Sequence, residues 1–166
     1  MKGEYQTITH PLKPLYDKGS KILILGSFPS VKTREYGFFY GHPQNRYWKI
    51  MERLFGVELS RDIEERKQFI LSNHIAMYDS IYKCDIIGSS DASIKNVIPS
   101  NLKEVVEASE IKEVFLNGAT SYKYYKKFHY PKLGIKGVKL PSTSPANARY
   151  RLDELIEEWK IILDYL

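Results

Sequence analysis

The feature that most constrains the fold is a short aliphatic run, ILIL at residues 22–25, which passes directly into a turn of small residues, GSFPS at residues 26–30. Consecutive aliphatic residues without alternation are typical of a strand that is covered on both faces. Gly, Pro and Ser after such a run indicate a tight turn where the strand ends. Residues 21–27 are therefore expected to form a buried strand that leads into a rigid polar loop.

Similar short apolar runs recur at residues 75–81, 113–117 and 137–140. Helical patterns lie between and after these runs, at residues 45–55, 60–71, 101–108, 119–128 and 150–165. Strands that alternate with helices predict an α/β fold, here a three-layer α/β/α sandwich around a central, mainly parallel four-stranded sheet, with residues 1–166 forming one domain. The irregular segment at residues 82–97 is expected to be a loop over the functional site.

The composition, with 43% hydrophobic and 27% charged residues, is that of a soluble globular protein. No apolar run approaches the roughly 20 residues that span a bilayer, and residues 1–10 lack the apolar stretch of a signal peptide. The single cysteine, Cys84, excludes an internal disulfide and a cysteine-ligated cluster, and the four histidines lie far apart. We expect a cytoplasmic monomer, associated with the nucleoid if the organism is a prokaryote, without metal, cofactor or membrane partner.

The positive charge is concentrated in one segment. The chain has a net charge of +5, and eight of its 25 Lys and Arg residues lie within residues 121–151, which contain none of its 20 Asp and Glu residues. Tyrosines are interleaved with these cations. A basic stripe with aromatic residues is typical of a protein that binds a polyanion, although a solvated lysine-rich face has the same composition. Its position beside a polar loop favours nucleic acid.

Two further polar segments accompany the first turn. HPQN at residues 42–45 follows an aromatic loop, and PSTSPAN at residues 141–147 follows the last predicted strand. In open sheets of this type ligands bind outside the carboxyl ends of the strands, where these loops are expected to meet. The sequence therefore predicts one site at one edge of the sheet.

Several familiar chemistries do not fit these loops. The first turn has one Gly where a dinucleotide-binding fingerprint needs three, and no G-K-[ST] phosphate loop is present. No G-x-S-x-G nucleophile elbow exists, and Ser27 lacks an evident His/Asp pair. What remains is a site of amides, hydroxyls and aromatic rings. Such a site suits a reaction in which water is positioned and developing charge is stabilised by fixed dipoles.

These motifs resemble those of the uracil-DNA glycosylase superfamily, most closely its hypoxanthine-DNA (deoxyinosine) glycosylase branch. GSFPS at residues 26–30 resembles the first glycosylase motif. YGHPQNRYW at residues 40–48 is similar to the H-P-x-N-R-[FY]-W segment shared with the mismatch-specific uracil glycosylases, and LPSTSPANAR at residues 140–149 is similar to the closing P-S-x-S motif. The resemblance runs from about residue 21 to residue 149, with only strand and helix order between the motifs.

The resemblance implies a uracil-DNA glycosylase-like fold and base excision from DNA that contains a deaminated base. A nucleotide is flipped from the duplex into a pocket, and water hydrolyses its N-glycosidic bond without metal or cofactor. The branch implies that the enzyme releases hypoxanthine from deoxyinosine. No lysine is placed to form a Schiff base with C1′, so we expect a monofunctional glycosylase that does not cleave the strand.

One departure from the related mismatch-specific enzymes bears on catalysis. Their first motif carries an Asn that positions water, whereas the aligned residue here is Phe28, which cannot hold water. The resemblance to the hypoxanthine branch makes Asn45 the candidate catalytic residue, because its amide can both accept from and donate to a water. Asn45 is equally suited to cap the helix that follows it, and the two roles are compatible.

The resemblance also supplies candidates for the base pocket. Tyr40 aligns with the aromatic residue that stacks on the flipped base, and Phe28 could form the opposite wall; both are also suited to ordinary core packing. Asp79 stands where uracil-specific relatives read the base edge with Asn, or it is unrelated to the pocket. His42 could bind the base or a phosphate, or brace its loop, and Asn117 fits a turn residue better than a site residue.

The closing motif and its surroundings provide candidates for DNA-backbone binding. Ser142 and Ser144 resemble the hydroxyls that bind the phosphates around a flipped nucleotide, or they simply cap the last helix. Lys139 and Arg149 are expected to contact the phosphate backbone, which would make binding depend on salt. Asn147 is the candidate wedge that enters the vacated base stack, since no bulky apolar residue is available at this position.

Two alternatives stay open. A uracil or mismatch-specific DNA glycosylase is the nearest one, although Phe28 argues against efficient uracil chemistry. A non-catalytic nucleic-acid-binding domain with the same fold is the alternative from another class.

Overall fold

The computed structural model describes residues 3–166. Its centre is a four-stranded sheet with strand order β3-β2-β6-β7 in which all neighbouring strands are parallel. The strands are β2 (Ile22–Gly26), β3 (Ile75–Asp79), β6 (Glu113–Asn117) and β7 (Gly137–Leu140). All residues of β2 and β3 are buried, as expected for strands that are covered on both faces. The predicted sheet and its four strands are confirmed.

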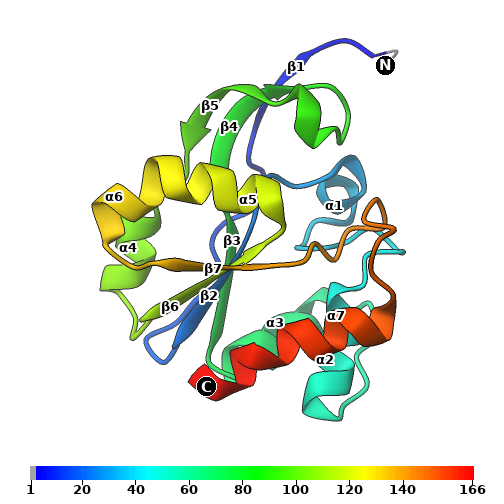
Figure 1. The fold of residues 1–166 in the computed structure, drawn as a ribbon, viewed down its shortest axis with the longest axis vertical. Helices are drawn as coiled ribbons and strands as arrows, with labels where there is room; N and C mark the ends of the chain where they lie inside the picture. Colours follow the sequence, from blue (N-terminus) through cyan, green and yellow to red (C-terminus); the bar gives the residue numbers. More distant parts are fainter. Residues whose placement is uncertain (1–2) are drawn as a thin grey trace.

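Helices cover both faces of this sheet (Figure 1). One side carries α2 (Tyr47–Phe55), α3 (Ile63–Ser72) and α7 (Leu152–Trp159). The other side carries α4 (Leu102–Glu107), α5 (Ala119–Tyr124) and α6 (Tyr130–Leu133). Each long helix turns apolar residues toward the sheet, for example Ile50 and Met51 of α2, which are fully buried. The three-layer sandwich is therefore confirmed as well.

The predicted helices exist but several are shorter than expected. The pattern at residues 119–128 is divided into α5 and a π-helical turn, Tyr125–His129, and the last pattern becomes 3₁₀-helical after α7, over Lys160–Tyr165. Helix α2 ends where predicted, at Gly56, whose φ of 65° is easily adopted only by glycine. A short helix that the sequence did not predict, α1 (Val31–Tyr36), follows the first polar turn.

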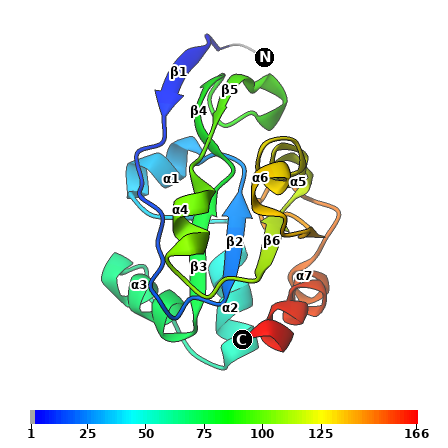
Figure 2. The ribbon, with the colours of Figure 1, turned by 90° about the vertical axis from the view of Figure 1, so that its left-hand side faces the viewer.

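A second sheet replaces the loop that was expected at residues 82–97. It is antiparallel, with strand order β1-β4-β5, and it stands beyond the carboxyl end of β2 (Figure 2). Its strands are β1 (Gln6–Thr9), β4 (Ile81–Ile86) and β5 (Lys95–Pro99). The loop prediction was wrong because these strands are short, β1 and β5 contain no fully buried residue, and the β4–β5 pairing is interrupted by register shifts. Only the connection after β4, including a 3₁₀ turn at Asp91–Ser93, extends over the site.

The core is divided in the same way as the sheets. The large cluster packs both faces of the parallel sheet against the helices, and a smaller one lies beneath the antiparallel sheet. Phe28 belongs to the smaller cluster, with Ile81, Cys84, Ile86 and Tyr124. Within residues 3–166 no helix has the length and apolar character required to cross a bilayer.

Candidate functional site

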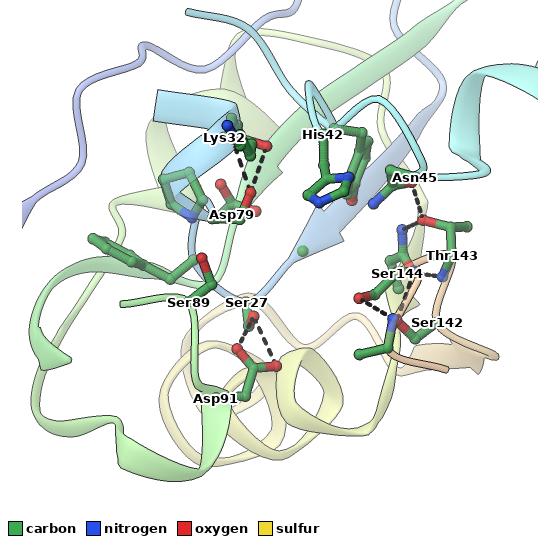
Figure 3. A pocket seen from close by; sticks show the side chains of 18 of the residues that line it. Ser27, Lys32, His42, Asn45, Asp79, Ser89, Asp91, Ser142, Thr143 and Ser144 are labelled. Atoms are coloured by element: carbon green, nitrogen blue, oxygen red, sulfur yellow. Dashed lines mark hydrogen bonds between the residues drawn. The ribbon is translucent and has the colours of Figure 1, made fainter. Parts of the chain in front are cut away.

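A cavity of about 630 Å³ opens at the carboxyl ends of the parallel strands (Figure 3). Four connecting segments form most of its wall: residues 26–33 after β2, residues 39–45, residues 86–91 after β4 and residues 142–146 after β7. Asp79 at the end of β3 and Asn117 at the end of β6 complete it. The predicted meeting of the polar loops at one edge of the sheet is observed.

The structure brings most of the predicted site residues into this wall. Those that line the cavity are Phe28, Tyr40, His42, Asn45, Asp79, Ser142 and Ser144. Lys139, Asn147 and Arg149 do not line it. Asn117, which the sequence assigned to a turn, does line it.

Asn45 occupies a position in which helix capping and cavity lining coincide. Its side-chain oxygen Oδ1 accepts hydrogen bonds from the backbone N–H of Tyr47, at 2.9 Å, and from the hydroxyl of Thr143, at 2.8 Å. The first bond satisfies a donor at the start of α2, so the capping role is real. Both lone pairs of Oδ1 are thereby used, and the amide nitrogen lies on the cavity side (Figure 3).

Arg46, the next residue, organises the loop that follows β7. Its guanidinium donates hydrogen bonds to the carbonyl oxygens of Ser144, at 2.7 Å, of Asn147, at 2.9 Å, and of Tyr150. Because these carbonyls point toward Arg46, the loop is held in one conformation by charge-assisted bonds. Sequence reasoning missed this role; the arginine is part of the quoted motif, but its partners are backbone atoms and leave no sequence pattern.

The loop after β7 carries two serine hydroxyls, and the oxygen of each already accepts one hydrogen bond from a backbone N–H of the same loop. The Ser142 hydroxyl accepts from the Ser144 N–H, at 3.1 Å, and the Ser144 hydroxyl accepts from the Ala146 N–H, at 3.2 Å. Each hydroxyl proton is left to donate, as a phosphate oxygen requires. The amide of Asn147 donates to the Ser142 carbonyl, at 2.9 Å, so in this conformation it braces the loop. Its role as a wedge stays a prediction.

His42 braces its own loop and also faces the cavity. Its Nδ1 accepts the backbone N–H of Gln44, at 3.0 Å, so a proton is carried by Nε2. The two interpretations of His42 are therefore compatible, since one ring nitrogen serves the loop and the other is left to donate toward the cavity (Figure 3).

Asp79 is paired with a histidine that the sequence did not single out. Its Oδ2 lies 2.6 Å from Nε2 of His10, and both side chains are buried. The Nδ1 of His10 accepts the backbone N–H of Leu12, at 3.1 Å, so the hydrogen on Nε2 is the one that bonds Asp79. The Asp79 carboxylate is thereby fixed with its second oxygen, Oδ1, free of this pair. His10 lies in a polar N-terminal segment and carries no spacing signal.

Tyr40 lies beside Asp79 with an unpaired hydroxyl. The backbone of Tyr40 has a φ of 53°, which is uncommon for a residue of this size, and its ring packs against Tyr47 with centroids 4.5 Å apart. The hydroxyl is buried and has no partner of hydrogen-bond distance and angle within residues 3–166, although the Asn117 side chain lies near enough to oppose part of the rise in its pKa. Burial raises the pKa of Tyr40 well above its usual value, and the negative charge of Asp79 raises it further. The hydroxyl is therefore a protonated donor.

Gly26 explains how these two groups approach one strand end. A Cβ atom at Gly26 would lie 2.4 Å from Oδ1 of Asp79 and 3.2 Å from the Tyr40 hydroxyl. Only a residue without a side chain fits there. The glycine of the GSFPS turn is therefore required by the site.

Phe28 packs in the smaller core cluster and also lines the cavity, so its two predicted roles are compatible. Only 8% of its surface is exposed, and its ring meets the His10 ring edge-on, with centroids 5.8 Å apart. It supports the His10–Asp79 pair from the side of the smaller core while one edge lines the cavity.

A second carboxylate, Asp91, enters the wall from the antiparallel sheet. The Ser27 hydroxyl donates to it at 3.3 Å, and desolvation raises the pKa of Asp91 above its ordinary value, with a further contribution from the charge of Asp79. Residues 82–97 were predicted to be a loop over the site, but Asp91 was not singled out within it because no motif marks this residue.

The cations that were predicted to bind the DNA backbone flank the lining segment 142–146 in sequence but do not line the cavity. Lys139 and Arg149 are both exposed, and the Lys139 ammonium lies 5.9 Å from the centre of the Tyr122 ring. Among residues 3–166 no group of three or more His, Cys, Asp or Glu side chains is arranged to bind a metal ion. Lys32 also lines the cavity (Figure 3), although the sequence predicted no lysine in its wall.

Comparisons with known proteins agree with this fold and identify a family. A sequence profile of the Uracil DNA glycosylase superfamily matches residues 13–164. The chain is 30% identical over 141 residues to a hypoxanthine DNA glycosylase of Methanosarcina barkeri, covering 82% of this chain and 86% of the relative. It is 29% identical over 150 residues to the protein of that name from Methanosarcina acetivorans, covering 88% and 92%.

A solved structure shows the same fold. The solution NMR structure of a Methanosarcina acetivorans protein named as a uracil DNA glycosylase superposes with a TM-score of 0.77, at 24% identity, over 95% of this chain and 96% of that one. The chain is therefore an α/β sandwich protein with a polar cavity at the carboxyl ends of its parallel strands. The chain belongs to the uracil DNA glycosylase superfamily. Its activity class is accordingly that of a DNA glycosylase.

Proposed function

We propose that this protein is a monofunctional DNA glycosylase that removes hypoxanthine from deoxyinosine and so initiates base-excision repair of deaminated adenine. The observation that carries the proposal is the pairing, at one end of the cavity, of an acceptor and a donor. Oδ1 of Asp79 is the acceptor and the unpaired hydroxyl of Tyr40 is the donor. The names of the two Methanosarcina relatives support the same substrate.

Deamination changes adenine in the way that this pair can detect. Adenine presents an amino donor and the N1 acceptor, whereas hypoxanthine presents the O6 acceptor and the N1–H donor. Asp79 accepts from N1–H, and the Tyr40 hydroxyl, which is covered in the free protein, becomes a donor to O6 when its side chain shifts toward the base. Adenine would place its N1 lone pair against a buried carboxylate, which leaves both groups unsatisfied. Guanine carries the same edge as hypoxanthine, so its 2-amino group must be excluded by contact with the wall.

The remaining wall provides the other functions that excision needs. The hydroxyls of Ser142 and Ser144 donate to the phosphates that flank the flipped nucleotide, with Lys139 and Arg149 on the phosphates farther along. Asn45 is the catalytic residue, facing the sugar and the scissile bond from the other side of the cavity. Water adds to C1′, the C1′–N9 bond breaks, its electron pair stays with the base, and the abasic strand is left intact.

Uracil is the second candidate substrate, because its O4 and N3–H present the same acceptor and donor to Tyr40 and Asp79. The two bases differ in size, and the cavity of about 630 Å³ accommodates either. The uracil DNA glycosylase superfamily match keeps this activity within the class.

The test is excision from labelled duplexes that carry one deoxyinosine or one deoxyuridine, in EDTA, followed by alkali to break abasic sites. We expect cleavage of the deoxyinosine strand only after alkali. The matched variant is Asp79→Asn, which keeps the shape but offers an amide, and its excision of hypoxanthine should fall about 10- to 100-fold, as expected for losing one buried hydrogen bond to the reacting group. Cleavage without alkali contradicts monofunctional action, preferential cleavage at deoxyuridine reassigns the substrate, and salt-sensitive binding without product favours a non-catalytic binding domain.

A further inference from the structure

The hydrogen bonds behind Asn45 form a chain whose direction is fixed at both ends. At one end the backbone N–H of Thr143 donates to Oδ1 of Asn117, at 2.9 Å. At the other end the backbone N–H of Tyr47 donates to Oδ1 of Asn45, at 2.9 Å. A backbone N–H can only donate, so both of these side-chain atoms must be the oxygens of their amides.

The direction of every bond between the two ends follows. With its oxygen assigned, Asn117 donates through Nδ2 to the hydroxyl of Thr143, at 3.0 Å. The hydroxyl has one proton, and Oδ1 of Asn45, 2.8 Å away, is the acceptor for it. Asn45 therefore accepts twice and cannot turn its amide without placing its NH₂ group against two donors.

Burial keeps this arrangement from changing. Thr143 is fully buried and Asn117 is 9% exposed, so the bonds between these two residues are shielded from water, while the bonds to Asn45 are partly buried. Bonds in such a setting are strong when complete and costly when one partner is missing. The NH₂ group of Asn45 is the end of the hydrogen-bond chain that points into the cavity (Figure 3).

We propose that Thr143 is a positioning residue that holds Asn45 as a hydrogen-bond donor only, and that Asn45 acts on the departing base instead of accepting from the attacking water. This rests on the glycosylase function proposed above. It also corrects the expectation that the Asn45 amide both accepts from and donates to the water, because its oxygen has no lone pair left.

The chemistry of the step supports a donor at this position. As the C1′–N9 bond of deoxyinosine breaks, its electron pair moves onto the base, and the amide N–H of Asn45 donates to an acceptor atom of that base as negative charge develops. Water forms the new bond to C1′ and gives its proton to Asp91, the carboxylate of the cavity wall that does not read the base edge. The released base takes up a proton afterwards, so charge and atoms balance.

The first test compares two substitutions of one residue. Thr143→Val removes the hydroxyl and keeps the shape, so the Asn45 amide is no longer held; we expect the single-turnover excision rate to fall about 10- to 100-fold, with the dissociation constant for DNA changed less than about threefold. Thr143→Ser keeps the hydroxyl and should stay within about threefold of the wild type. Ser109→Ala, which removes a hydroxyl bond to the Val105 carbonyl, is the control for a general loss of stability.

The second test reverses the polarity of Asn45 itself. Asn45→Asp keeps the oxygen that accepts from Tyr47 and Thr143 but presents a negative oxygen to the cavity in place of N–H. A donor role predicts that Asn45→Asp and Asn45→Ala both lose about 100- to 1,000-fold in excision rate. An Asn45→Asp enzyme within tenfold of the wild type would show that an acceptor is sufficient and would overturn the proposal.

The outcomes separate this inference from the proposed function. If the wild type releases no base, the proposed function fails before any variant is compared. If the wild type excises hypoxanthine and Thr143→Val does so at the same rate, the function stands and the positioning role of Thr143 is wrong. Loss of rate in Thr143→Val without recovery in Thr143→Ser would likewise overturn the role of the hydroxyl.

Discussion

The two ends of the cavity differ in how completely their polar groups are paired. At the end formed by Asn45, Thr143 and Asn117, the hydroxyl and both amide oxygens have partners within the protein. At the end formed by Tyr40 and Asp79, a buried hydroxyl has none among the described residues. The first end is organised before any ligand arrives, and the second is complete only when a ligand supplies the missing acceptor.

This difference separates positioning from selection. Groups that act on every substrate gain from being fixed in advance, because they need no reorganisation when the reaction occurs. Groups that choose a substrate gain from being left unpaired, because a wrong base then leaves buried polar atoms unsatisfied. The comparison predicts that substitutions at the paired end disturb the positions of groups that act on every substrate, whereas removal of the unpaired hydroxyl lowers activity without lowering stability.

The largest effect is expected at Arg46. Arg46→Met removes a charged donor from several loop carbonyls, and we expect a loss of about 3 kcal/mol in unfolding free energy, the size of one or two charged hydrogen bonds. DNA affinity should fall with it, because the loop that carries Ser142 and Ser144 is released. Urea denaturation and fluorescence anisotropy measure the two losses. Arg53→Met, on the exposed side of the same helix, is the control, and an equal effect there contradicts the role of Arg46.

A smaller effect is expected at His10. His10→Ala leaves Oδ2 of Asp79 buried without its donor, so unfolding free energy should fall by about 1–3 kcal/mol. Excision should also slow, since the carboxylate is no longer held against the base edge. Thermal denaturation and single-turnover excision are the measurements, with the exposed His74→Asn as control. Unchanged excision by a folded His10→Ala protein would show that Asp79 needs no support.

Tyr40 should show opposite signs for stability and activity. Tyr40→Phe removes a buried hydroxyl that has no partner among residues 3–166, so the free protein should gain about 1 kcal/mol in unfolding free energy. Excision of hypoxanthine should nevertheless fall about tenfold, the cost of one hydrogen bond to the base. The exposed Tyr82→Phe should change neither quantity. A destabilised Tyr40→Phe protein would mean that the hydroxyl is paired in the free protein after all.

The smallest effect concerns the surrounding surface. Replacing Lys139 and Arg149 by Gln should weaken DNA binding a few-fold and lower the slope of log affinity against log salt by about 1 for each phosphate that is no longer neutralised. The excision rate at saturating DNA should not change, because neither residue lines the cavity. Lys160→Gln, on the last helical turn, is the matched control. A salt slope that is equal in all three proteins would remove both residues from the DNA surface.

The sequence predicted the part of the fold that repeats a simple pattern. Strands such as β2 are continuous apolar runs because helices cover both of their faces, and such runs are visible in a single sequence. The strands of the antiparallel sheet were missed because β1 and β5 are short and contain no fully buried residue, so they leave no continuous apolar run. Asp91, which the connection after β4 brings into the cavity wall, was not singled out because no motif marks it.

Site residues could be predicted where they lie in short contiguous sequence motifs. Asn45 and Ser142 belong to short motifs that the resemblance identified, and both line the cavity. Thr143 lies inside one of those motifs, but its role depends on the directions of hydrogen bonds that only the folded chain defines. His10 has no motif, because its partner Asp79 is 69 residues away and the pair forms only through tertiary folding.

The long sequence separation of the Arg46 contacts has a consequence for the protein during its synthesis. Arg46 and the Ser144 carbonyl that it binds are 98 residues apart, so a ribosome must add most of the chain before the loop after β7 can be held. At roughly 5–20 residues per second, strands β2, β3 and β6 emerge seconds earlier and can begin to collapse. A nascent chain is thus expected to become compact before it can bind damaged DNA. Incomplete copies would then not occupy damaged sites that they are unable to repair.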